Sequence, residues 1–134
     1  MKNSVFKSIL MVAALVCCMA CEKDDDSRDV YVGSFKIKQQ AIIDGVTVED
    51  NYNITIVKSS VNSSDIIINN ILNTGYSANA TINNGTNFTI PQQTITDSGV
   101  SGSGRIDGSY IRFSIMVTGQ FAGQINFTCE GPKQ

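Results

Sequence analysis

The sequence predicts an all-β domain, a small antiparallel up-and-down (meander) β-barrel of about eight strands. From Val30 onward, apolar and polar residues alternate in short runs, and no helical period is present. Asx-Gly pairs, the strongest short-range hairpin signals, separate several runs at Asp44-Gly45, Asn84-Gly85 and Asp107-Gly108. The runs follow one another without long connections. This favours a closed meander over the alternative, a two-layer β-sandwich.

The first hairpin can be tested from the pattern alone, because a slip of one residue turns every side chain to the other face. We expect strands at about 30–43, 46–57, 65–72, 76–82, 86–96, 100–106, 109–118 and 123–130. A two-residue loop at the first Asx-Gly pair sets Ile43 opposite Val46 and Ile37 opposite Tyr52. Apolar residues then meet apolar residues along one face, except where Gln39 lies opposite an aspartate.

The other two Asx-Gly hairpins give further expected registers. At the third pair, a two-residue loop places Gly104 opposite Ile111. At the second pair, a three-residue loop with Gly at its last position places Ala80 opposite Phe88. Pro91 cannot donate a ladder hydrogen bond, so we expect a bulge or a break in the fifth strand.

The inward face that results from these registers carries no charge. Its members are Phe35, Ile37, Tyr52, Ile54, Ile56, Ala78, Ala80, Ile82, Phe88, Ile90, Ile106, Ile111, Phe113, Ile115, Val117, Ile125 and Phe127. An eight-stranded barrel is just wide enough for side chains to fill or to hold one small ligand. We therefore expect any pocket to be apolar and neutral.

Five inward residues are the candidate ligand-lining residues: Phe35, Tyr52, Gly102, Gly104 and Phe113. The two glycines leave room on the inward face that a ligand could occupy. The structural alternative is that missing side chains let the sheet bend sharply or let another backbone approach closely.

The first part of the chain differs in character from the rest. Lys2 and Lys7 precede an apolar run, Ile9 to Val16, which has about the length of a secretory h-region and is too short to span a bilayer. Ala20, a small residue, stands directly before Cys21. This arrangement resembles a bacterial lipoprotein signal peptide, in which the peptidase cleaves before a cysteine whose thiol carries a diacylglyceryl group.

The resemblance implies a signal peptide at 1–20 and lipidation at Cys21, with two or three acyl chains such as palmitate. Such chains would hold the protein on the membrane almost permanently. The sequence departs from the family at Cys18, where the family usually has Leu. Cys18 is also the rival lipidation site. The alternative to both is an ordinary secretory signal with incidental cysteines.

The run that follows, residues 22–29, contains no apolar residue, and we expect a solvated tether of at most about 28 Å. It resembles the acidic export signal that sends lipoproteins of the Bacteroidota type to the outer face of the outer membrane. A plain spacer is the alternative. The expected organisation is a signal peptide (1–20), a lipidated cysteine with an acidic tether (21–29) and a barrel domain (30–134).

The barrel itself resembles the calycin-like barrels and the small lipocalin-like lipoproteins among them. Tyr31-Val32-Gly33-Ser34-Phe35 opens the first strand as the lipocalin G-x-W motif does, with Phe35 where Trp is expected. The chain has no Trp. The arginine that packs on that ring in lipocalins has no clear counterpart either, because Arg112 falls on the outward face.

The residues that could support catalysis have structural explanations. The chain has no histidine, which removes the commonest general base and metal ligand. Glu49 and Asp50 are adjacent on a strand and so point to opposite faces. Cys129 lies two and four residues after Phe127 and Ile125, so it shares their inward face and is expected to be a small buried hydrophobic residue. No loop has the ligand spacing of a calcium site. We therefore expect no enzymatic activity, no metal and no cofactor.

These observations lead to an expected role. Beyond the tether the body is near neutral and has no basic patch, so nucleic acid is not an expected partner. We expect a membrane-anchored lipoprotein of the outer membrane that faces the cell exterior. It would bind a small apolar ligand, another envelope protein or a glycan. The alternative is a structural or accessory subunit whose filled barrel binds no small molecule.

Overall fold

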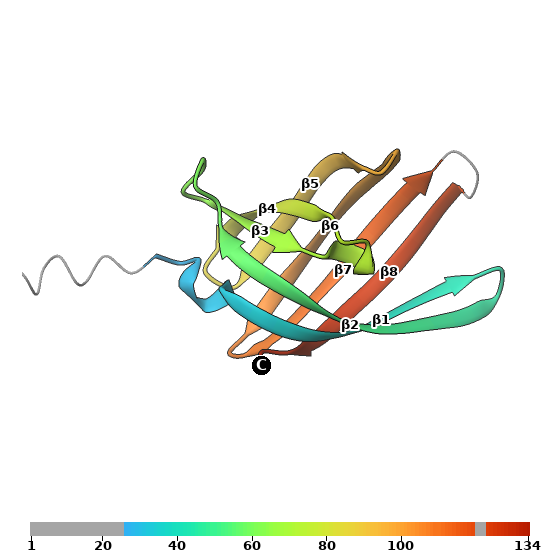
Figure 1. Ribbon diagram of the computed structural model, residues 1–134, viewed down its shortest axis with the longest axis horizontal. Helices are drawn as coiled ribbons and strands as arrows, with labels where there is room; N and C mark the ends of the chain where they lie inside the picture. Colours follow the sequence, from blue (N-terminus) through green and yellow to red (C-terminus); the bar gives the residue numbers. More distant parts are fainter. Residues whose placement is uncertain (1–25, 120–122) are drawn as a thin grey trace, which may run out of the picture.

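The protein folds into a closed barrel in a computed structural model, which describes residues 26–119 and 123–134 (Figure 1). Each strand pairs with the next and the last pairs with the first, so the predicted antiparallel meander is confirmed. The strands are β1 (Gly33–Ile43), β2 (Val46–Lys58), β3 (Asp65–Asn69), β4 (Ser77–Asn84), β5 (Asn87–Ile95), β6 (Ser98–Asp107), β7 (Tyr110–Gly119) and β8 (Gly123–Pro132). The proposed signal peptide and Cys21 lie outside the described residues. Within those residues, no helix has the length and apolar character needed to cross a membrane.

The first hairpin has the predicted register along its whole length. Ile43 lies opposite Val46 and Ile37 opposite Tyr52. The bulge expected at Pro91 is present as a register shift between Ile90 and Gln93 of β5. Hairpin chemistry and the period of two were therefore sufficient to specify this part of the barrel.

Two other predicted registers are wrong by two residues. Gly104 lies opposite Phe113 rather than Ile111, because Gly108 (φ 60°) is the first residue of the turn, where a type II′ turn places its glycine. Phe88 lies opposite Ile82 rather than Ala80, because a bulge precedes a turn placed further along the chain. A slip of two residues keeps each side chain on the same face, so the predicted inward face survives both errors.

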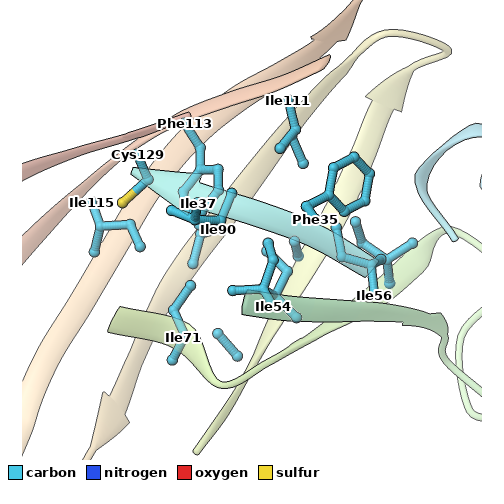
Figure 2. Close-up of a cluster of buried hydrophobic side chains, with 14 of the residues drawn as sticks. Phe35, Ile37, Ile54, Ile56, Ile71, Ile90, Ile111, Phe113, Ile115 and Cys129 are labelled. Atoms are coloured by element: carbon cyan, nitrogen blue, oxygen red, sulfur yellow. The ribbon is translucent and has the colours of Figure 1, made fainter. Parts of the chain in front are cut away.

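Side chains of the inward face fill the barrel. Figure 2 shows Phe35, Ile54 and Phe113, which come from different strands, inside one cluster. Thirteen of the predicted inward residues are buried, and Ile82, Val117, Ile125 and Phe127 are partly buried. Cys129, whose inward position was also predicted, is buried in the same core. The core contains further residues absent from the list of inward residues: Tyr31, Ala41, Ile66, Ile68, Ile71, Ile95 and Val100.

A short 3-10 turn, η1 (Asp29–Tyr31), covers one end of the barrel, which we call the closed end. The expected strand 30–43 therefore begins only at Gly33. The ring of Tyr31 packs edge-on against Phe88, with 5.6 Å between the ring centroids. Lys133 places its Nζ 5.5 Å from the centroid of the Phe35 ring and donates to the Val30 carbonyl at 2.9 Å. The cation that lies over the ring of Phe35 is therefore Lys133, a contact that the sequence did not indicate.

The expectation of a solvated tether is wrong for its described part. Arg28 is only 9% exposed. Its Nη1 donates to the backbone carbonyls of Ser59, Asn62 and Asp65 at 3.1, 3.2 and 3.1 Å. Its Nε and Nη2 donate to the Asp26 carboxylate, at 3.0 and 2.7 Å to the nearer oxygens. These hydrogen bonds, which we call the Arg28 clamp, fix the chain from residue 26 onward to the closed end. They also hold the pKa of Asp26 well below its ordinary value.

The hydroxyl of Tyr31 is buried and has no hydrogen-bond partner within the described part of the chain. Burial raises its pKa to about 12. Tyr31→Phe is expected to raise the free energy of unfolding by about 1 kcal/mol, because an unsatisfied buried hydroxyl is removed. Tyr52→Phe is the matched control, and we expect the opposite sign, because the Tyr52 hydroxyl donates to Gln39. Urea unfolding curves measure both, and a less stable Tyr31→Phe protein would contradict the assignment.

Candidate binding site at the open end of the barrel

The end opposite η1, which we call the open end, contains an apolar cavity of about 240 Å³. The β1–β2 turn, the β3–β4 connection and the β5–β6 turn all lie at this end, because alternate connections of a meander share one end. The lining residues come from five strands and two connections: Gln39, Ile71, Leu72, Thr74, Ile95, Thr96, Ser98, Val100, Val117 and Phe127. None of them is ionisable.

The wall on one side of the cavity is the 3-10 turn η2 (Ile71–Asn73). The sequence had suggested a strand as far as residue 72, but Asn70 adopts a left-handed conformation (φ 65°) and ends β3 at Asn69. The Asn70 amide donates to the Asn53 carbonyl at 2.8 Å and accepts from the Gly75 N–H at 2.8 Å. The turn is thereby held against the barrel, with Ile71 fully buried.

A buried polar group, the amide of Gln39, belongs to the cavity lining. Its oxygen accepts hydrogen bonds from the Tyr52 hydroxyl and from the Cys129 thiol, the latter at 3.7 Å. Burial raises the pKa of the Cys129 thiol to about 12. The thiol is therefore protonated at neutral pH and unsuited to nucleophilic attack. The three side chains form a neutral polar layer beneath an apolar cavity.

The apolar surface continues from the cavity onto the first hairpin. Phe127 of β8 pairs with Ala41 of β1, which pairs with Val48 of β2, so the three side chains share the inward face. Pairing of β1 with β8 stops at Ala41, and the hairpin then diverges from β8 (Figure 1). Val46 and Val48 consequently remain 62% and 47% exposed. Such apolar surface beside a cavity is typical of binding sites.

Unusual backbone conformations gather at the same end. Within residues 26–119 and 123–134, the non-glycine residues with positive φ are Asp44, Asn70, Leu72, Asn73, Thr96 and Asp97, and all lie in connections at the open end. Leu72 (φ 53°) and Thr96 (φ 47°) are unfavourable residues for this conformation, and both line the cavity. Strained backbone of this kind clusters at ligand-binding and switch regions.

The candidate ligand-lining residues do not line this cavity. Phe35 lies under Lys133 at the closed end, and Tyr52 reaches the cavity only through its hydrogen bond to Gln39. The ring of Phe113 packs on that of Phe88, with 6.3 Å between centroids.

The two candidate glycines are sites of close approach between β6 and its neighbours. A Cβ at Gly102 would lie 2.1 Å from the Ser114 carbonyl oxygen. A Cβ at Gly104 would lie 2.5 Å from the Phe88 ring and 2.5 Å from the Arg112 carbonyl oxygen. The space left by the missing side chains is thus already occupied by protein, as the structural alternative supposed.

A larger hollow of about 570 Å³ lies on the outer face of the barrel. Its lining includes Lys38, Arg105, Arg112 and Glu130, which are exposed side chains that make ion pairs with neighbouring residues. Arg112 is outward-facing, as predicted, and its guanidinium lies over the ring of Tyr110. This lining is charged and exposed to water, whereas the lining of the cavity at the open end is mostly apolar and has no ionisable side chain. The open end is therefore the better candidate site.

Comparison with models of known protein families gives no match to this chain, and comparison with curated protein sequences gives none.

Proposed function

We propose that this protein is a non-catalytic, outer-membrane lipoprotein that binds a small apolar ligand at the open end of its barrel. The observation that carries the proposal is the apolar cavity, which opens above a filled core. Ligand sites are concave, mostly apolar and supplied with few polar groups. The strained backbone at Leu72 and Thr96 supports the same location, because both residues line the cavity.

The size and the lining of the cavity define the class of ligand. About 240 Å³ is below the usual range of pockets for drug-sized molecules, so the cavity suits a short chain or one end of a longer molecule. The lining contains hydroxyl and amide groups but no ionisable side chain. A charged ligand group buried there would have no partner of opposite charge, which is costly. The preferred ligand is therefore an uncharged apolar group with at most one hydroxyl or carbonyl.

The anchor is supported by the sequence alone. Ala20-Cys21 after a short apolar run fits a lipoprotein signal, and the acidic residues that follow fit an export signal to the cell surface. A second candidate role is that of a structural or accessory subunit that binds no small molecule. The filled core below the cavity favours it. Native mass spectrometry of protein purified without denaturation separates the two, because a bound ligand adds mass and a filled barrel does not.

Leu72→Asn tests the binding site. Asn tolerates positive φ better than Leu, which offsets part of the stability lost when the partly buried Leu72 side chain no longer packs against the core. The cavity loses an apolar wall. We expect 1-octanol to bind the wild type and to bind the variant about tenfold more weakly. Octanoate, with the same chain length and a charge, should bind the wild type less well than octanol.

Val61→Asn is the matched control, because Val61 is 95% exposed in the β2–β3 loop at the closed end. Isothermal titration should give the same octanol affinity for this variant and the wild type. Equal affinities for Leu72→Asn and the wild type would remove the open end as the site. No octanol binding by a folded wild type would favour the accessory-subunit role.

A further inference from the structure

The Arg28 clamp fixes where the chain leaves the barrel. Arg28 reaches the carbonyls of the β2–β3 loop, and Asp26 is bound to Arg28 through its side chain. Lys58 at the end of β2 also forms ion pairs with Asp26 and Asp29. The segment from Asp26 onward therefore belongs to the closed end and cannot serve as a free linker.

Few residues remain between this fixed point and the proposed anchor. Only residues 22–25 separate Cys21 from Asp26, and five peptide units span at most about 18 Å. The ten residues of β7 run about 30 Å, which corresponds to more than about 20 Å along the barrel axis after tilting. An inverted barrel would hold its closed end at least that far above the bilayer, and the remaining residues cannot reach so far.

We infer that the closed end of the barrel faces the anchoring membrane and that the open end points away from it. The inference rests on the proposed lipidation of Cys21. The cavity then receives its apolar ligand from the side opposite the membrane, and the lipids of the anchoring bilayer do not enter it. The first hairpin, with exposed Val46 and Val48, projects in the same outward direction.

Energy transfer to the membrane surface tests this orientation. Val61 at the closed end and Ile42 on the hairpin are both exposed apolar residues, and each is replaced by cysteine in the full, lipidated protein. After signal cleavage, Cys129 is the other unacylated thiol, and it is buried and protonated. A maleimide donor dye then labels one chosen site. The proteins are reconstituted into phosphatidylcholine vesicles with an acceptor dye on the headgroups.

The expected result is several-fold more efficient energy transfer from residue 61 than from residue 42. Adding Arg28→Ala should reduce this difference, because it releases the clamp and lengthens the linker. The control is the near-ultraviolet circular dichroism spectrum of the Arg28→Ala protein. A spectrum unchanged from that of the wild type would show that the barrel remains folded. Membrane-bound protein with equal transfer from both sites, or with more from residue 42, would overturn the inference. Protein that stays in solution would overturn the lipidation proposal first and the orientation with it.

Discussion

Gly131→Ala is expected to destabilise the barrel by about 3 kcal/mol or more. A Cβ at this position would lie 1.7 Å from the Lys36 carbonyl oxygen and 2.7 Å from its carbonyl carbon. Both obstacles are backbone atoms of β1, so no side chain can rotate away to relieve the clash. The ladder between β1 and β8 has four pairs, Lys38–Ala41 with Phe127–Glu130, and the clash falls beside it. The substitution therefore strains the seam that closes the barrel.

Gly85→Ala is the matched control for this substitution. Gly85 lies in the β4–β5 turn, its φ is not in the left-handed region, and no heavy atom lies within 4 Å of the Cβ that alanine would add. Urea unfolding followed by circular dichroism should give a midpoint close to that of the wild type for Gly85→Ala. It should give a much lower one for Gly131→Ala. Equal midpoints for the two variants would mean that β1 and β8 do not meet as described.

Cys21→Ala is expected to move the protein from the membrane fraction to the soluble fraction. Each buried CH₂ of an acyl chain contributes about 0.8 kcal/mol, and stable anchoring takes two or more lipid signals. Removing the acylated cysteine removes all of this affinity. Fractionation of cells followed by immunoblotting measures the shift.

Cys18→Ala serves as the control, because Cys18 is the rival lipidation site. This variant should partition as the wild type does, since cleavage before Cys21 removes residue 18. A shift caused by Cys18→Ala alone would move the anchor to that cysteine. Unchanged partitioning of both variants would eliminate lipidation. Protease treatment of intact cells then distinguishes exposure on the cell surface from exposure in the periplasm.

Much of the fold could be predicted because a strand repeats every two residues. The hairpin at Asp44-Gly45 has the predicted register, and Pro91 marks the predicted irregularity. The errors came from turns in which an Asx-Gly pair does not itself form the two-residue loop. At the β6–β7 turn, Asp107 ends the strand and only Gly108 enters the loop. A period of two cannot detect a slip of two residues.

The candidate site was harder to predict than the fold. Inward parity indicates that Phe35 and Phe113 face the interior, but it does not give their height along the barrel axis. Ile71 and Leu72 lie in a connection, where strand parity does not apply. The signal available was an apolar pair between turn-forming residues, Asn69-Asn70 and Thr74-Gly75. Such a pair in a loop indicates that the loop folds over the core.

Arg28 shows a different limit of sequence reasoning. Its partners at residues 59–65 are backbone carbonyls more than thirty positions away, and any residue type supplies a carbonyl. No side-chain pattern could therefore indicate the contact. The surrounding acidic residues suggested a solvated linker instead.

A methyl-resolved NMR titration with 1-octanol tests the central claim, that the open end of this closed barrel is a binding site. We predict chemical-shift changes concentrated at Ile71, Leu72, Ile95 and Val117, which line the cavity, and little change at Ile37 and Ile54 in the filled core. Changes at the exposed Met116, which borders a second hollow on the outer face, with none at the cavity would contradict this account.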